Sequence, residues 1–98
     1  MGYYLDGRVN VVFGTHTHVP TSDMQILPGG SAYVTDLGMC GESGGILGMD
    51  KDRVILRMRS HLPHPFKVAS GPLVADGVIF ELDTKSGKVT STKSVKIT

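Results

Sequence analysis

Short runs of apolar residues, broken by glycine and proline, make up most of the pattern along the chain. Residues 9–13 are apolar at every position but Asn10, which is typical of a strand covered on both faces in an α/β or sandwich sheet. Two further runs, residues 24–27 and 31–36, flank a Pro-Gly-Gly turn and predict a β-hairpin. The first third of the chain therefore predicts strands joined by turns and loops.

Two segments carry helix signals. Residues 2–7 have the pattern of the last turn of a helix, which Gly7 would end. Residues 50–62 predict an internal helix that Asp50 caps and that Pro63 stops. Its apolar residues recur at positions i, i+3 and i+7 and so share one face: Ile55, Met58 and Leu62.

The rest of the chain predicts β structure and one long loop. Strand candidates are residues 66–70, 77–83 and 88–97, and residues 84–88 form a hairpin turn with glycine in the left-handed position. Residues 37–49 contain five glycines without a steady period, which predicts an ordered loop. Together these elements predict an α/β (or α+β) chain that is mostly β with one or two helices.

The length and net charge of the chain limit the classes of protein to which it can belong. A chain of 98 residues is long enough for one modest core, and a net charge of +1 gives no electrostatic reason to expect a stable nucleic-acid partner. No stretch approaches the roughly 20 apolar residues that a membrane span needs. The one cysteine, Cys40, cannot form an internal disulfide. These features favour a cytoplasmic location.

Two histidines with one threonine between them follow the first predicted strand. His16 and His18 come directly after Gly14 and Thr15. Side chains two residues apart in an extended segment leave on the same side, so both imidazoles could face one site. Sheet proteins place ligands at such strand ends, and histidine is the commonest metal ligand. The pattern predicts metal binding, with hydrogen-bonded scaffold histidines as the alternative.

Charge balance limits what this pair can do alone. Two neutral imidazoles cannot balance two divalent cations, so a two-metal site needs anionic ligands as well. Asp23, Asp36 and Glu42 are nearby in sequence, but their spacing does not indicate ligation. Asp36, at a strand end, could orient a histidine by hydrogen bonding behind it, or it could bind the backbone amides of a turn. His16 and His18 therefore look like part of a site that other residues complete.

The chain also resembles a known family. Residues 14–21, GTHTHVPT, resemble the last metal-binding motif of calcineurin-like metallophosphoesterases. More narrowly, this motif followed by ILPGG (26–30), TDLGM (35–39) and GILGM (45–49) resembles the C-terminal part of the bacterial YmdB family of phosphodiesterases. The resemblance extends over residues 2–82.

The resemblance implies a sandwich of two β-sheets flanked by helices, with a two-metal centre at the sheet ends. The cofactors would be two divalent metal ions, iron or manganese, with zinc as another option. His18 would bind the first metal and His16 the second, and the substrates would be phosphodiesters, including 2′,3′-cyclic nucleotides. The family's other ligands precede this motif and have no counterpart here. The resemblance therefore predicts that residues 1–98 are a C-terminal fragment of a metallophosphoesterase domain.

Such a fragment would be inactive alone, and we expect it to pair with its missing N-terminal half or to form oligomers. Two other functions stay open from the sequence. One is a non-catalytic β-rich binding or oligomerisation module whose histidines are vestigial. The other is a structural site for one metal ion, in which a second chain adds carboxylates to His16 and His18.

Overall fold

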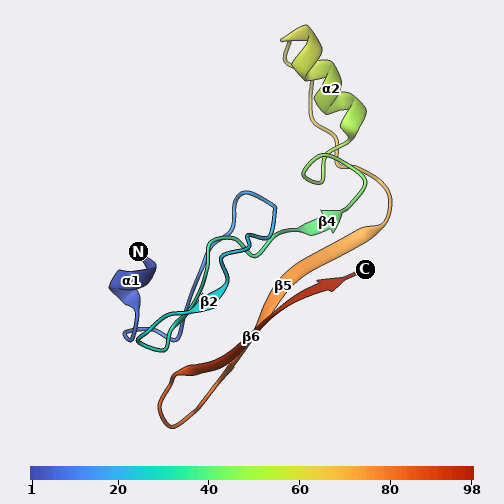
Figure 1. Cartoon of the computed structure of the whole chain (residues 1–98). Coiled ribbons are helices and arrows are strands. Elements are labelled where there is room, and N and C mark those ends of the chain that lie inside the picture. The colour runs from blue at the N-terminus through green and yellow to red at the C-terminus, as the bar shows by residue number, and fades with distance from the viewer. The chain divides into compact units, whose positions relative to one another are not determined.

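The computed structural model describes all 98 residues, and the chain divides into two compact units (Figure 1). The first unit comprises Met1–Met39 and Asp76–Lys96, and the second comprises Cys40–Ala75 and Ile97–Thr98. None of the helices has both the length and the apolar composition needed to cross a membrane.

The first unit is built on a three-stranded sheet. Its strands β1 (Val11–Phe13), β2 (Gln25–Ile26) and β3 (Ala32–Val34) have the order β1-β3-β2. β1 is parallel to β3, with Val11 opposite Ala32, and β2 is antiparallel to β3. The predicted β2–β3 hairpin is confirmed. The pairing leaves β3 at the centre of the sheet.

The prediction that the first strand is covered on both faces is wrong. Val11 and Val12 are half-buried, and the side chain of Phe13 is 59% exposed. β1 also pairs only with β3, so it is an edge strand rather than the centre of its sheet. The central strand instead contributes to the core, because Ala32 and Val34 are buried.

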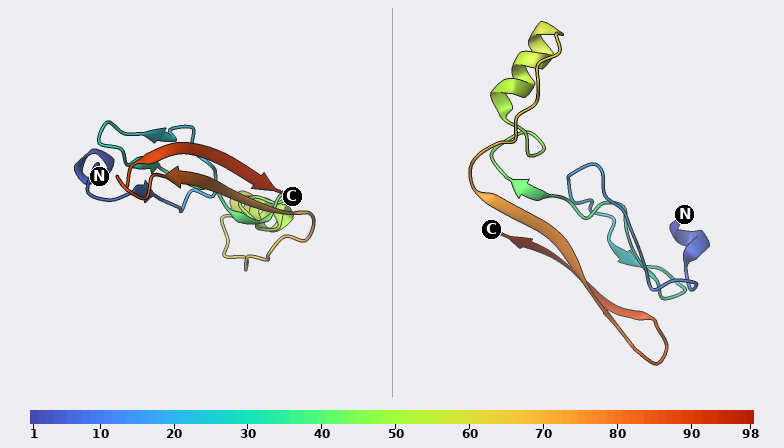
Figure 2. Two further views of the ribbon diagram at one scale, coloured as in Figure 1. Left: turned by 90° about the horizontal axis from the view of Figure 1, so that it is seen from below. Right: turned by 180° about the vertical axis from the view of Figure 1, so that it is seen from behind.

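Most of a long hairpin, residues 76–96, belongs to the first unit. β5 (Leu73–Leu82) and β6 (Val89–Ile97) are neighbours in a second three-stranded sheet, and they run side by side in both views of Figure 2. Gly87 in their turn has φ +73°, which confirms the predicted left-handed glycine. Val89 is buried, and its N–H donates to the carbonyl of Gly30 at 2.9 Å, which fixes the hairpin against the β2–β3 turn.

The N-terminal helix is one turn long. α1 (Gly2–Leu5) is followed by Gly7 with φ +79°, as the predicted stop requires. The carboxylate of Asp6 then accepts hydrogen bonds from the N–H of Gly29 at 2.6 Å and of Ser31 at 3.1 Å. These bonds attach the end of the helix to the β2–β3 turn.

Two predictions in the second unit are wrong. Residues 37–49 are not all loop, because β4 (Cys40–Glu42) pairs antiparallel with the first residues of β5. The sequence pattern predicts that this strand begins at residue 77, whereas β5 begins at Leu73. The residues left out of the prediction are the ones that pair with β4. Within the strand predicted at residues 66–70, only Val68 pairs, in a single bridge to Met49. The tight turn at Ile46–Met49 leaves no extended segment with which more of these residues could pair.

The internal helix is confirmed as α2 (Lys51–Ser60). The side chain of Asp50 accepts a hydrogen bond from the N–H of Arg53 at 3.0 Å, which is the predicted cap. The helix ends at Ser60, three residues before the predicted proline stop, and its C-cap residue His61 has a left-handed φ of +54°. None of the residues of α2 is buried.

We predict that the core of the first unit depends on Leu27. Its side chain is 3% exposed, so Leu27→Ala should lower the free energy of unfolding by about 2–5 kcal/mol. Leu82→Ala is the control, because Leu82 is 42% exposed and loses fewer contacts. Urea unfolding followed by circular dichroism measures both, and equal losses would contradict the assigned core.

Candidate functional site

The two histidines lie in the loop that follows β1. Because β1 and β3 are parallel, their carboxyl ends are at the same edge of the sheet. The loop after β1 carries His16 and His18, and the turn after β3 carries Asp36. The topology therefore brings two segments of the chain, about 20 residues apart in sequence, to the edge where α/β sheets bind ligands.

The histidine loop is attached to the turn after β3 at three points. The N–H of Leu37 donates to the carbonyl of Gly14 at 3.0 Å. Thr17, between the two histidines, donates to the side chain of Asp36. Thr21 donates its N–H to the carbonyl of Asp36 at 3.1 Å, and its hydroxyl accepts the N–H of Asp36 at 2.9 Å. The loop is held at its start, middle and end.

Gly14 is needed for the first attachment. A Cβ at this position would lie 2.3 Å from the carbonyl oxygen of Thr35, which is far inside van der Waals contact. Only glycine lets the backbone leaving β1 come this close to the backbone leaving β3. The glycine that closes the strand in the sequence therefore also permits the loop to dock.

Asp36 is the centre of the site's hydrogen bonding. Its side chain is buried, with 1% of the residue exposed. One carboxylate oxygen accepts the N–H and the hydroxyl of Thr17, at 2.7 and 2.8 Å, and the other accepts the N–H of Gly38 at 2.8 Å. Asp36 thus binds backbone amides, which was one of the two roles predicted for it.

These donors keep Asp36 ionised. The hydrogen bond from Gly38 lowers the pKa of the carboxyl most, the donors of Thr17 lower it further, and burial opposes them. Attraction to His18 also lowers the pKa of Asp36. An anion therefore lies beneath the histidine loop at neutral pH.

Asp23 has a structural role that the sequence did not reveal. One of its carboxylate oxygens accepts the hydroxyl of Thr21 at 2.7 Å and the N–H of Thr35 at 3.1 Å, and the other accepts the hydroxyl of Thr35. The hydrogen bonds, led by that of the Thr35 hydroxyl, lower the pKa of Asp23 to about 2. In the sequence, the only local indication of this role of Asp23 is the threonine two residues before it. Glu42, the third acidic residue near the histidines in sequence, lies in the second unit.

The backbone at both histidines is strained. His16 has φ +119° and His18 has φ +66°, and both side chains are exposed. Positive φ is uncommon for residues other than glycine and costs about 1–3 kcal/mol at each position. The prediction that the segment is extended is wrong, because the bonds from Thr17 to Asp36 turn the backbone. The shape of the loop, rather than strand alternation, sets the directions of the imidazoles.

The donor set fits part of a metal site. Imidazole nitrogen is a suitable ligand for iron and zinc, and both rings are accessible. The chain has no group of three or more histidine, cysteine, aspartate or glutamate side chains arranged to hold a metal ion. The carboxylates of Asp23 and Asp36 are used in hydrogen bonds. Two nitrogen ligands alone do not complete a catalytic site, which needs about three protein ligands for each metal ion.

Other polar side chains do not join this site. His61 is exposed at the end of α2, and His64 is half-buried with its Nε2 3.0 Å from the hydroxyl of Ser60. Cys40 is an exposed free thiol in the second unit. None of these three residues lies in the histidine loop or in the turn after β3.

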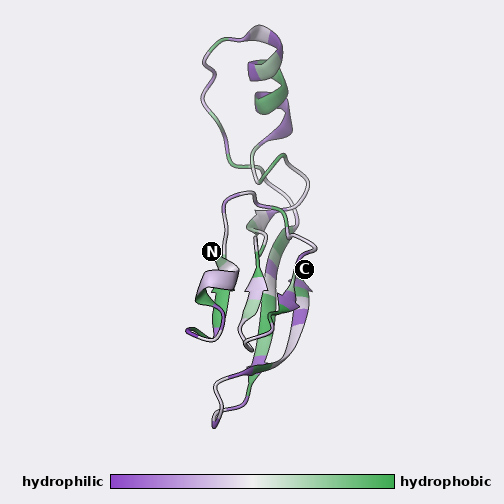
Figure 3. Ribbon diagram, turned by 60° about the vertical axis from the view of Figure 1, so that its left-hand side comes forward, coloured by the Kyte–Doolittle hydropathy of each residue, from purple (hydrophilic) through white to green (hydrophobic).

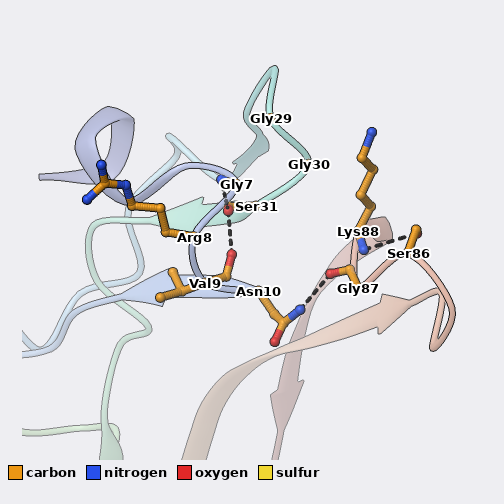
Figure 4. Close-up of a pocket in the computed structure, with 10 residues that line it drawn as sticks. All are labelled: Gly7, Arg8, Val9, Asn10, Gly29, Gly30, Ser31, Ser86, Gly87 and Lys88. Atoms are coloured by element: carbon orange, nitrogen blue, oxygen red, sulfur yellow. Dashed lines mark hydrogen bonds between the residues drawn. The ribbon is translucent and has the colours of Figure 1, made fainter.

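A cavity of about 160 Å³ lies at the opposite, amino-terminal ends of β1 and β3 (Figure 4). Its polar groups are bonded to one another: Asn10 donates to the carbonyl of Gly87 at 2.6 Å, and Ser31 accepts the N–H of Gly7. The side chains of Arg8 and Lys88 extend outward from it, and Arg8 lies over the ring of Tyr4. This cavity is therefore a weaker candidate than the histidine loop.

We predict that acid weakens the fold through the carboxylates under this loop. The pKa values of Asp23 and Asp36 are lower in the folded chain than the usual 3.8, so both stabilise the fold above that pH. The free energy of unfolding should therefore fall as the pH drops from 3.8 toward about 2. Asp36→Asn should lower stability at pH 7 and make the fall shallower, as measured by urea unfolding at each pH.

The control for this prediction is Asp52→Asn, at an exposed position of α2 without a hydrogen-bond partner. It should leave the pH profile unchanged. A profile for Asp36→Asn as steep as that of the unmodified chain would contradict the assigned hydrogen bonds.

Comparison with known proteins places the chain in context. A family model described as YmdB-like protein matches residues 1–95. The 2′,3′-cyclic-nucleotide 2′-phosphodiesterase of Bacillus subtilis (strain 168) is 45% identical over 97 residues, which cover 99% of this chain and 37% of that protein. The chain thus spans little more than a third of the length of this curated relative.

Solved structures agree with this match. The crystal structure of a novel phosphatase from Mycoplasma pneumoniae superposes with a TM-score of 0.92 at 39% identity, over 98% of this chain and 34% of the other. A hypothetical protein from Thermus thermophilus gives a TM-score of 0.89 at 34% identity, over 98% and 37%. The predicted α/β class, mostly sheet with two helices, is confirmed. The match over residues 1–95 shows that the chain belongs to the YmdB-like family.

Proposed function

We propose that this chain supplies two histidine ligands to the two-metal centre of a phosphodiesterase that acts on 2′,3′-cyclic nucleotides. The observation that carries the proposal is the His16-Thr17-His18 loop, strained at both histidines and fixed to a buried carboxylate at the carboxyl edge of parallel strands. Backbone strain of this kind concentrates at functional sites. The name of the Bacillus subtilis relative supports the choice of substrate class.

In this proposal His18 holds the first metal ion and His16 the second. The ions are iron or manganese, with zinc as a further option, because imidazole suits several of these metals. When bound, such a pair of ions would polarise the phosphate and lower the pKa of a bound water to about 7. Phosphodiester hydrolysis at neutral pH needs both effects.

The chain's own residues prepare the ligands. Asp36 stays ionised, so it continues to accept the N–H and hydroxyl of Thr17 and keeps the loop bent. Because these hydrogen bonds restrict the backbone of the loop, binding of a metal ion by the imidazoles would cost little further backbone entropy. Asp36 thus acts on the ligands through the backbone of Thr17, the residue between them.

The remaining ligands would come from outside these 98 residues. We propose that residues 1–98 form the C-terminal part of a metallophosphoesterase domain and that this part is inactive alone. The whole domain would work in the cytoplasm. The proposal is supported by the missing third ligand and by the share of the relative that the chain covers. The alternative is a non-catalytic module with vestigial histidines, which the lack of a three-ligand cluster also favours.

The test of the ligands grafts the 97 matched residues into the Bacillus subtilis relative, in place of its corresponding segment. We expect manganese-dependent hydrolysis of 2′,3′-cyclic AMP. His16→Asn and His18→Asn should each lower the rate at least about 100-fold, because asparagine tolerates positive φ but lacks the imidazole.

The matched control is His61→Asn, which replaces another histidine with positive φ outside the site. It should leave the rate unchanged. Full activity of both loop variants would contradict the ligand assignment and favour the non-catalytic module.

For the 98-residue chain by itself we predict no turnover of 2′,3′-cyclic AMP with manganese, iron or zinc, because two nitrogen ligands do not assemble a two-metal centre. The assay follows nucleotide products by chromatography. Metal-dependent turnover that His18→Asn abolishes would show that the chain completes a site with its own residues or with a second copy.

A further inference from the structure

Asp76 is an acidic residue within the mostly apolar strand β5. Figure 3 shows hydrophobic stretches along the strands, with hydrophilic positions between them. The side chain of Asp76 is only 7% exposed. Aspartate is uncommon in strands, and burial of its carboxyl group is costly unless partners compensate for the lost water. The partners of Asp76 therefore indicate what this residue does.

The ion pair of Asp76 accounts for little of this burial. The Nζ of Lys96 lies 3.7 Å from Oδ1 of Asp76, but the side chain of Lys96 is 62% exposed. An ion pair with such an exposed member contributes little to stability, because water and salt screen it. The closer contacts of Asp76 are with another segment of the first unit.

This segment is the turn that follows β3. The N–H of Asp76 donates to the carbonyl of Met39 at 2.9 Å, and Oδ2 of Asp76 accepts the N–H of Met39 at 3.4 Å. The preceding residue, Gly38, packs closely against the same side chain. A Cβ on Gly38 would lie 2.5 Å from Cβ of Asp76 and 2.8 Å from Cγ of Pro20, two residues after His18. Asp76 and the histidine loop thus both contact Gly38.

Gly38 connects Asp76 to the buried carboxylate beneath the histidines. The N–H of Gly38 donates to one oxygen of Asp36 at 2.8 Å, and the other oxygen accepts the N–H of Thr17 at 2.7 Å. The direction of the Gly38 N–H depends on how the turn is held, and the contacts of Asp76 hold it from β5. The contacts therefore form a continuous series from Asp76 through Gly38 and Asp36 to Thr17.

We propose that Asp76 is a positioning residue for His16 and His18, which it holds in place through Gly38 and Asp36. The inference rests on the proposed function, because it concerns the same two ligands. Without the side chain of Asp76 the turn loses contacts, the Gly38 donor is held less firmly, and the bend at the histidines is less fixed. Removal of groups that orient metal ligands typically lowers metal affinity about 10- to 100-fold.

Amide hydrogen exchange, followed by NMR, tests the coupling in the 98-residue chain without a metal ion. In Asp76→Ala the N–H of Thr17 should exchange at least about 10-fold faster relative to that of Ala32, because Asp36 is held less firmly. Ala32 is the reference, because its N–H is bonded within the sheet and reports unfolding of the whole unit. Asp76→Asn should behave like the unmodified chain, because its amide oxygen can still accept the N–H of Met39.

The Bacillus subtilis relative that carries the grafted residues measures the consequence for metal binding. Asp76→Ala should raise the manganese concentration for half-maximal activity about 10-fold and leave KM for 2′,3′-cyclic AMP unchanged at saturating manganese. A general loss of folded protein would not raise the manganese requirement by itself. The matched control is Glu81→Ala, which removes another acid of β5, bonded to the hydroxyl of Ser91, and should change neither constant.

Three results would overturn the positioning role. The first is an unchanged exchange rate of Thr17 in Asp76→Ala. The second is equal acceleration of Thr17 and Ala32, or loss of the folded state, because Asp76 would then support the whole unit. The third is faster exchange of Thr17 without a higher manganese requirement. Failure of the proposed function gives a separate result, full activity of the His16→Asn and His18→Asn variants, and would overturn this inference with it.

Discussion

The buried carboxylate of Asp36 is the group on which the candidate site depends. A charge removed from water is costly unless hydrogen-bond donors surround it, and here the amides of Thr17 and Gly38 and the Thr17 hydroxyl do so. These bonds hold the backbone of His16 and His18 at positive φ, a conformation that the loop would not keep by itself. One ionised side chain thus converts a flexible connection into a fixed pair of imidazoles.

The parallel pairing of β1 and β3 makes this possible. It places the ends of both strands at one edge of the sheet, so that a loop and a turn distant in sequence can exchange hydrogen bonds. Gly14 lets the two backbones approach, and Asp23 links the far end of the loop to Thr35. The two histidines proposed as ligands thus lie in a loop that is fixed at its start, middle and end by residues of the same unit.

Helix α2 shows the opposite situation. The histidine loop is fixed by contacts within its own unit, whereas α2 has a cap at Asp50 but no buried side chain. Capping satisfies backbone groups at one end of the helix, but only packing against another surface removes the exposed apolar area from water. The site is thus stabilised by contacts within its own unit, whereas no side chain of α2 is buried within the chain.

The sequence by itself determined what depends on neighbours a few residues away. The β2–β3 hairpin, the Asp50 cap of α2, the left-handed Gly87 and the paired histidines after β1 all follow from such local signals. Only the tertiary structure decided that β1 is an edge strand, that β4 pairs with β5, and that the histidine loop is bent. The physical reason is that the partners in these cases lie far apart in sequence, 19 residues for Thr17 and Asp36, where no periodicity or turn preference reports them.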